Sequence, residues 1–180
     1  MSYLLSLDSS ITHTLSVFIP HNHFFNGFFA FFSFMGGAIV WWIIALILLV
    51  IYEEHRNHKF ISYFIGSFAT VYMLVNGILK NIFMRPRPIF SALSCPTDFS
   101  FPSTHAATAF AAAATLAFFD PKRTYFYYFI ALVVSYSRIY LGCHFIADTL
   151  VGGLTGWLIT KIILLAYIPY NKKRPSVHKK

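Results

Sequence analysis

The stretch from Phe24 to Tyr52 contains no charged side chain, and this feature constrains the fold more than any other. In a bilayer, backbone N–H and C=O groups must be paired within the protein, so such a segment crosses as a helix. About 20 apolar residues are enough to cross a hydrocarbon core of about 30 Å. The whole chain is 57% hydrophobic and 11% charged, whereas soluble domains carry about 25% charged residues. The sequence therefore predicts an integral membrane protein.

Four further apolar runs follow, separated by short polar turns and one long loop that contains several prolines. We expect an all-α integral membrane bundle of about five transmembrane helices, at residues 24–52, 60–79, 103–119, 125–140 and 144–168. Residues 1–23 mix apolar and polar side chains as far as Pro20, which is typical of an amphipathic helix in the membrane interface. The spacing of Gly152 and Gly156 predicts close helix packing. Residues 1–170 thus form one transmembrane domain, and residues 171–180 form a basic tail.

The basic residues do not form a stripe of the kind that binds nucleic acid, although the formal net charge is +8. Five of the 14 lie in the last ten residues, where a tail beside a membrane meets anionic lipid head groups. With five spans, nine basic residues fall on one side of the membrane and four on the other. The positive-inside rule then places the C-terminal tail in the cytoplasm and the loop at 80–101 outside. We expect a bilayer partner and no nucleic-acid partner.

Three polar segments fall on the predicted outer face, namely Lys80–Pro88, Pro102–His105 and Ser137–Asp148. Each has an ordinary structural interpretation as well. Lys80 and Arg85 can be residues at the end of a span that extend their charged groups to the interface. Ionisable groups in or near a membrane are nevertheless candidates for function. Because the charge topology puts all three segments on one face, the sequence favours a single site.

The second segment opens an alanine-rich helix and combines a cap with a histidine. Pro102 fixes the backbone at the helix entrance, and Ser103 is a suitable N-cap. The free N–H groups of the first turn, together with the positive end of the helix dipole, form an anion site. His105 lies one step inside the helix, where it is placed to donate a proton to a bound phosphate. The alternative is a capped helix with an interfacial histidine.

His144 and Asp148 are four residues apart, so on a helix they share one face. A carboxylate that accepts the N–H of one imidazole nitrogen fixes the tautomer and leaves the other nitrogen as a nucleophile. Lys80, Arg87 and Arg138 supply positive charge and donors for phosphoryl oxygens. Fixed cations and N–H groups hold the charge that builds up on a transferred phosphoryl group. The pattern therefore predicts phosphoryl transfer.

The acidic residues of the outer face are Asp8, Asp98 and Asp148, and they do not form a cluster suited to Mg²⁺. We expect turnover without a metal ion or another cofactor. Cys95 and Cys143 make neither a disulfide framework nor a zinc site. The favoured interpretation is two unpaired residues, and a disulfide formed in an oxidising compartment is the alternative.

With these residues in place, the sequence resembles the type 2 phosphatidic acid phosphatase (PAP2) superfamily, in its membrane lipid phosphatase branch. Lys80–Pro88 matches the motif K-x6-R-P, and the spacing selects Arg87 as the motif arginine. Ser137–Asp148 matches the motif S-R-x5-H-x3-D in full. Pro102–His105 matches P-S-G-H with one departure, because Thr104 stands where glycine is usual. Family members usually have six spans, whereas this chain shows five.

The resemblance implies a role for each motif residue. His144 is the nucleophile that forms a phosphohistidine, Asp148 orients it, and His105 is the general acid. The implied phosphate-binding residues are Lys80, Arg87, Ser103, Thr104 and Arg138. Thr104 acts mainly through its backbone N–H, and its hydroxyl offers an additional donor. Threonine is bulkier than glycine, which allows closer backbone approach, but we expect activity to survive.

These inferences predict a membrane-embedded phosphatase that hydrolyses a lipid phosphomonoester or diphosphate on the outer face. The expected substrate is undecaprenyl diphosphate or a related isoprenoid or glycerolipid phosphate, because the short external loops leave little protein to read a large head group. The alternative is an anion or lipid transporter that uses the same basic cluster without hydrolysis. The topology suits a bacterial inner (plasma) membrane, with the site facing the periplasm. The sequence specifies no oligomeric state.

Overall fold

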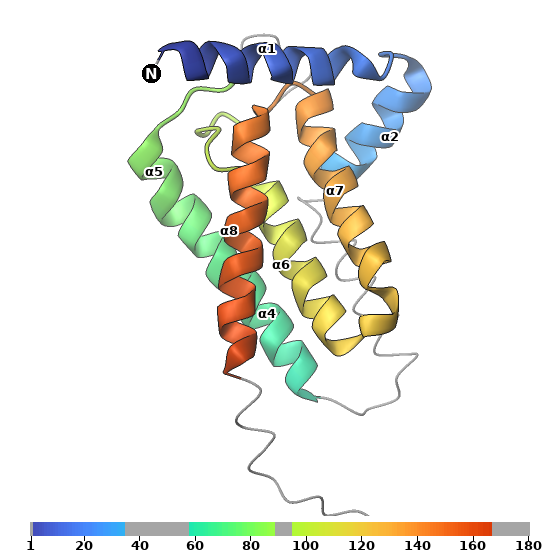
Figure 1. Cartoon of the computed structure of the whole chain (residues 1–180), viewed down its shortest axis with the longest axis vertical. Helices are drawn as coiled ribbons and strands as arrows, with labels where there is room; N and C mark the ends of the chain where they lie inside the picture. The colour runs from blue at the N-terminus through green and yellow to red at the C-terminus, as the bar shows by residue number, and fades with distance from the viewer. Residues whose placement is uncertain (1, 35–57, 89–94, 167–180) are drawn as a thin grey trace, which may run out of the picture.

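The computed structural model describes residues 2–34, 58–88 and 95–166, and every regular element within these ranges is helical. The elements are α1 (Ser2–Phe18), α2 (His23–Phe34), α4 (His58–Met73), the π-helical turn η1 (Leu74–Leu79), α5 (Lys80–Phe83), α6 (Thr104–Phe119), the 3₁₀ turn η2 (Pro121–Arg123), α7 (Thr124–Tyr140) and α8 (Ile146–Leu165). The long helices α4, α6, α7 and α8 form a bundle, and α1 lies across one end of it (Figure 1). The expected all-α class is confirmed.

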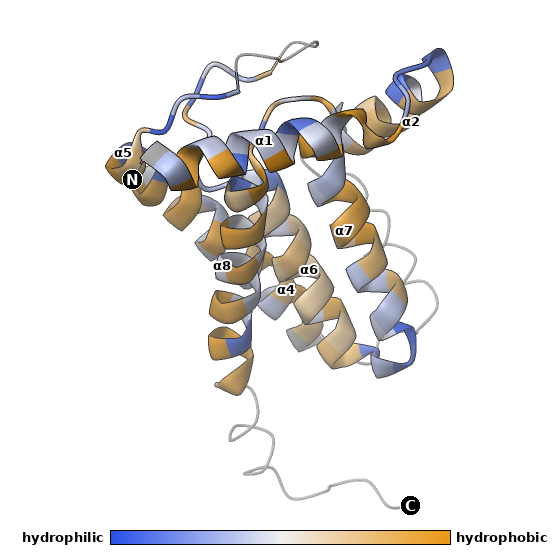
Figure 2. Cartoon of the chain, turned by 45° about the horizontal axis from the view of Figure 1, so that its top comes forward, coloured by the Kyte–Doolittle hydropathy of each residue, from blue (hydrophilic) through white to orange (hydrophobic). Residues whose placement is uncertain are grey.

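Among the described residues, two helical segments are long and apolar enough to cross a membrane, Phe60–Phe83 and Ile146–Leu165, and α6 is a shorter apolar helix. Hydrophobic residues dominate the bundle helices, whereas α1 mixes both kinds and the α6–α7 turn is hydrophilic (Figure 2). The count of five spans stays a prediction. Most of the predicted span at 24–52 and all of the tail at 171–180 lie outside the described residues.

The centre of the bundle is α6, which packs against α4, α7 and α8. Its alanines are buried along most of the helix, so neighbouring backbones approach closely. A side chain on Gly156 would overlap the carbonyl group of Ala107, and one on Gly152 would overlap the backbone of Ser103. The predicted close packing at these two glycines is confirmed, and it fixes the start of α8 against the start of α6.

The predicted end of the second span was wrong, because the helix does not stop at Leu79. It continues without a break through η1 and α5 to Phe83, so Lys80 is helical and buried. The helix ends at Met84, whose φ of 44° is left-handed. The last predicted span also begins later than expected. Gly142 has a φ of 68° and turns the chain, so His144 lies in the connection and α8 starts at Ile146.

Candidate active site

The three polar segments meet at the end of the bundle that α1 covers. Successive bundle helices run in opposite directions, so α5 and α7 end there and α6 and α8 begin there (Figure 1). Ser103 is fully buried, and its backbone N–H donates to the carbonyl oxygen of Asp148 at 2.9 Å. Its hydroxyl accepts from the N–H of Ala106 at 3.5 Å, which makes it the N-cap of α6 as predicted. The second and third segments are thereby joined directly.

His144 lies between a carboxylate and a guanidinium. Its Nδ1 atom is 3.4 Å from Oδ2 of Asp148, and its Nε2 atom is 3.0 Å from a terminal nitrogen of Arg87. If Nδ1 carries the proton toward the carboxylate, Nε2 presents its lone pair to Arg87. The Nδ1 separation is longer than a normal hydrogen bond. The imidazole therefore has the orientation that a nucleophilic Nε2 requires.

The His144 side chain is 1% exposed and lies outside both flanking helices. Burial holds its pKa well below its ordinary value, and the positive charges of Arg138 and Arg87 add to this effect. A neutral imidazole is the form that has a free nitrogen lone pair. The site thus keeps this histidine neutral at physiological pH.

Arg138 is 4% exposed and has unused hydrogen-bonding capacity. One terminal nitrogen donates to the hydroxyl of Ser33, in α2. Within the part of the chain that the structure describes, its Nε and its other terminal nitrogen have no hydrogen-bond partner. A buried guanidinium with two unpaired nitrogens is suited to binding two oxygens of one anion.

Asp98 joins the other two basic residues of the predicted site. Its carboxylate accepts from Nζ of Lys80 and, at 2.5 Å, from a terminal nitrogen of Arg87. Nε of Arg87 also donates to the backbone carbonyl oxygen of Asp98 at 3.0 Å. The carboxylate therefore takes the donors that were predicted to hold phosphate. Partial burial alone would raise the pKa of Asp98, but the hydrogen bonds and charges of Lys80 and Arg87 hold that pKa below its ordinary value.

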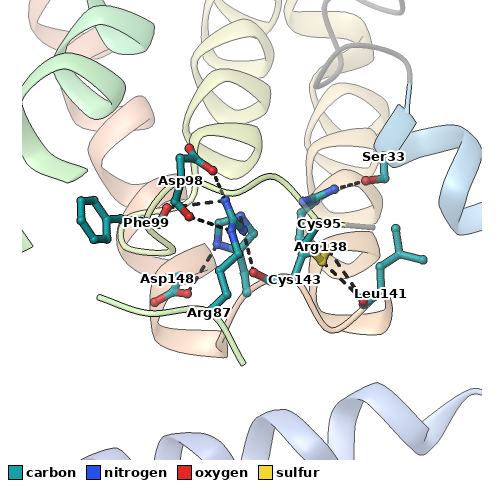
Figure 3. The surroundings of a disulfide bond; sticks show 10 residues. Ser33, Arg87, Cys95, Asp98, Phe99, Arg138, Leu141, Cys143 and Asp148 are labelled. Carbon is teal, nitrogen blue, oxygen red and sulfur yellow. Dashed lines mark hydrogen bonds and ion pairs between the residues drawn. A yellow bond between two sulfur atoms is a disulfide. The ribbon is translucent and has the colours of Figure 1, made fainter. Parts of the chain in front are cut away.

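A disulfide ties the Asp98 loop to the turn that carries His144. Cys95 and Cys143 are bonded, with their Cα atoms 5.5 Å apart, so the favoured interpretation of two unpaired cysteines was wrong. The long separation of 48 residues in sequence concealed a close approach in space. Figure 3 shows the Arg87 side chain extending toward Asp98 and Cys143, and a terminal nitrogen of Arg87 donates to the carbonyl oxygen of Cys143 at 2.7 Å.

Thr104, the departure from the expected motif, uses its hydroxyl within the fold. The hydroxyl donates to Oδ1 of Asn76 at 2.7 Å. Asn76 belongs to the π-helical turn η1, and such turns are frequent at functional sites. The hydroxyl is therefore engaged by protein, which leaves the backbone N–H of Thr104 as its donor for a ligand.

His105 lies one residue further along the first turn of α6. The charged and polar neighbours that act on its imidazole include Arg138 and His144, and the backbone of Ser33 also lies near it. The structure thus brings both predicted catalytic histidines to the same end of the bundle. Ser33 accepts a hydrogen bond from Arg138, which connects α2 to the site.

Several residues of this network escaped sequence reasoning. Asp98 was noted as acidic, but nothing in its spacing indicated that it pairs with Lys80 and Arg87. Arg85 was interpreted as a possible span-end cation, whereas it bonds to Asp148 at 2.8 Å and to Asp8 at 2.6 Å. The sequence contained a signal for a second role of Arg85, because two arginines in a proline-rich loop are more than the end of a transmembrane span requires.

Across residues 2–34, 58–88 and 95–166, no three side chains of His, Cys, Asp or Glu gather where they could hold a metal ion. Turnover without a metal stays a prediction. The cations that neutralise an anion at this site would be Lys80, Arg87 and Arg138.

The chain is thus a helical bundle that carries a buried histidine–aspartate pair and three basic side chains at one end. This arrangement is suited to binding an anion. The chain belongs to the PAP2 superfamily, whose family model matches residues 60–173. That range contains all three motifs as well as the disulfide.

Named relatives agree with this assignment. An undecaprenyl-diphosphatase of Sulfolobus acidocaldarius is 31% identical over 141 residues, covering 74% of this chain and 66% of the relative. Phosphatidylglycerophosphatase B of Bacillus subtilis is 36% identical over 97 residues, covering 48% of each protein. The matched part therefore spans about two thirds of the first relative and about half of the second.

Solved structures share the fold. A transmembrane PAP2-type phosphatidylglycerolphosphate phosphatase from Bacillus subtilis superposes with a TM-score of 0.73 at 24% identity, over 99% of this chain and 90% of that chain. LpxE of Aquifex aeolicus has a TM-score of 0.69 at 27% identity, over 89% of this chain and 94% of that chain. The arrangement of helices is thus that of known PAP2 membrane proteins.

Proposed function

We propose that the protein is a membrane-embedded lipid phosphatase that works through a phosphohistidine at His144. The observation that carries this proposal is the setting of His144, with Asp148 on its Nδ1 side and Arg87 on its Nε2 side. Relatives named as undecaprenyl-diphosphatase and phosphatidylglycerophosphatase support a phosphate ester or diphosphate as the substrate.

The proposed first step forms the covalent intermediate. Nε2 of His144 attacks phosphorus while the bond from phosphorus to the leaving oxygen breaks. Protonated His105 transfers its proton to that oxygen, and the negative charge of the bound phosphate favours this protonated form. The proton on Nδ1 of His144 remains beside Asp148, whose carboxylate balances the positive charge that the ring acquires.

The second step regenerates the enzyme. Neutral His105 takes a proton from water, and the water oxygen attacks phosphorus as the bond to Nε2 breaks. Inorganic phosphate leaves, and both imidazoles return to their starting states. Throughout, Arg138 offers its two unpaired nitrogens to phosphoryl oxygens. The backbone N–H of Thr104 adds a donor at the start of α6, whereas the N–H of Ser103 is already bonded to the carbonyl oxygen of Asp148.

The Asp98 carboxylate must release Lys80 and Arg87 before these residues can bind phosphate. Its carboxylate bonds to Lys80 and Arg87, so a phosphoryl group that uses these donors has to displace it. The Asp98 side chain is 46% exposed, which leaves room for it to turn toward water.

The proposed substrate is a lipid because the site lies at the end of apolar helices. We favour undecaprenyl diphosphate or a related isoprenoid or glycerolipid phosphate, hydrolysed on the outer face of a bacterial inner membrane with the C-terminus in the cytoplasm. The lateral apolar surfaces of α4 and α8 suit a molecule that diffuses within the bilayer.

Phosphate release tests the proposal. The purified chain in detergent micelles is given undecaprenyl diphosphate, phosphatidylglycerophosphate, phosphatidic acid and a lipid A phosphate, each in EDTA. We expect release from at least one lipid, and a loss of several orders of magnitude in His144→Ala. His23→Ala, an exposed histidine at the start of α2, serves as the matched control. Phosphate binding without release from any lipid would contradict the proposal and would favour the transporter instead.

A further inference from the structure

Arg85 does not join the phosphate-binding cations, although it is only two residues from Arg87. One terminal nitrogen donates to Oδ1 of Asp148 at 2.8 Å, and the other donates to Oδ2 of Asp8 at 2.6 Å. Its guanidinium carbon lies 3.9 Å from the ring centroid of Phe145. Arg85 thus contacts the side of Asp148 that faces away from His144.

The two oxygens of Asp148 have different partners. Oδ2 accepts from the backbone N–H of Phe145 at 2.9 Å and is the atom nearest Nδ1 of His144. Oδ1 is held by Arg85. A carboxylate pinned at both oxygens cannot rotate about its terminal bond, so its distance to the imidazole is fixed.

The side chains of this network are buried, so the charge of Asp148 depends on its bonded partner. The side chain of Asp148 is 0% exposed, and those of Asp8 and Arg85 are 11% and 16% exposed. A buried carboxylate needs a bonded counter-ion to remain charged. His144 is neutral before reaction, so the positive charge bonded to Asp148 comes from Arg85.

Asp8 belongs to α1, the helix that lies across the end of the bundle. Its Oδ1 atom accepts from the N–H of Ala147 at 3.1 Å, and Thr12 accepts from the N–H of Ile146 at 3.0 Å. The residue at the N-cap position of α8 is Phe145, whose side chain has no acceptor. Two residues of α1 therefore supply the caps that the sequence beside α8 lacks.

We propose that Arg85 and Asp8 are positioning residues for the reaction, with Arg85 holding Asp148 charged and aimed at His144 and Asp8 holding Arg85. This inference rests on the proposed function of His144 and Asp148, and it assigns α1 a part in positioning the nucleophile. Neither residue touches the phosphoryl group, so their effect is on turnover and not on phosphate binding.

Steady-state kinetics separate this role from phosphate binding. We expect Arg85→Gln to lower kcat by about tenfold to a hundredfold, as for partners that orient a reacting group, with KM within about twofold of wild type. Arg85→Lys should recover part of the loss, and Asp8→Asn should lower kcat by a smaller factor. In the Asp148→Asn background, Arg85→Gln should have no further effect. The matched control is Arg123→Gln, which breaks a similar arginine–aspartate pair at the opposite end of the bundle.

A spectroscopic readout keeps the test independent of turnover. The ¹⁵N shifts of labelled histidine, assigned by comparison with His144→Ala, report which ring nitrogen of His144 carries the proton. We expect a fixed Nδ1–H form in the wild type and a smaller share of that form in Arg85→Gln, where only the contact of Arg87 with Nε2 still favours it. A raised KM with unchanged kcat, or a loss that multiplies fully with Asp148→Asn, would overturn the inference, as would an unchanged tautomer. An inactive wild type whose tautomer still depends on Arg85 would contradict the proposed phosphatase function alone.

Discussion

Replacing Asp98 by asparagine removes the carboxylate that holds Lys80 and Arg87. A phosphoryl group that binds these two cations competes with that carboxylate, so its removal should tighten anion binding. Asparagine keeps the size of the side chain, and the bond from Nε of Arg87 to the backbone carbonyl oxygen at this position is unaffected. The change therefore isolates the charge.

The magnitude follows from the two ion pairs that are lost. The Asp98 side chain is 46% exposed, so each pair is weakened by water and contributes about 0.5 to 1 kcal/mol. Together they amount to about 1 to 2 kcal/mol, which corresponds to about fivefold to thirtyfold in a dissociation constant. We expect Asp98→Asn to lower the Kd for inorganic phosphate, and the KM for a lipid phosphate, by this factor.

Calorimetric titration with inorganic phosphate measures the effect directly, and Asp120→Asn is the control. Asp120 also pairs with an arginine, but it lies at the other end of the bundle, so its loss should leave the phosphate Kd unchanged. Because Lys80 and Arg87 hold the pKa of Asp98 below its ordinary value of 3.8, the carboxylate stays charged from pH 5 to pH 8. The advantage of the variant should be constant there and shrink as the wild-type carboxylate takes up its proton at lower pH. An equal or weaker affinity of Asp98→Asn for phosphate would refute the reasoning.

Three further outcomes follow from the fold and the site. Replacing Cys95 and Cys143 by serine should lower the free energy of unfolding by up to about 4 kcal/mol, given the separation of 48 residues. A thermal midpoint of the wild-type protein that does not change in reductant would argue against this. Gly156→Ala should destabilise the protein by about 1 to 3 kcal/mol, because its methyl group would meet the backbone of Ala107. Gly77→Ala should not, because its methyl group would have no atom of another helix within 4 Å. Equal thermal midpoints of the two variants would contradict the packing. Since the neutral imidazole reacts and the pKa of His144 is lowered, protonation of His144 should not reduce kcat/KM between pH 8 and pH 6.5, and a pH profile showing such a loss would conflict with the site geometry.

Helix limits could be predicted wherever the chain contains a proline or a capping residue. Pro102 and Ser103 mark the start of α6, and the turn at Asp120 and Pro121 marks its end. Where such residues are absent, the predicted helix end was wrong. No proline or glycine separates Leu79 from Phe83, so the helix runs on and carries Lys80 on its last turn.

The motif residues of the site were predictable because their spacing encodes the chemistry. His144 and Asp148 are four residues apart in the sequence, and the charge topology predicted that the basic residues share one face. Their counter-charges were not predictable, because Asp8 and Asp98 reach the site from other elements through tertiary packing. The disulfide was missed for the same reason, since pairing depends on the distance between two Cα atoms that the sequence does not contain.

The central claim is that His144 carries phosphate during turnover, and trapping tests it most directly. The chain is mixed with a lipid labelled with ³²P in the phosphate to be released, quenched within milliseconds in alkali, and digested. We predict an acid-labile, alkali-stable label on the peptide that contains His144, and no such label in His144→Ala. Rapid lipid hydrolysis with no protein-bound label in the wild type would contradict the claim.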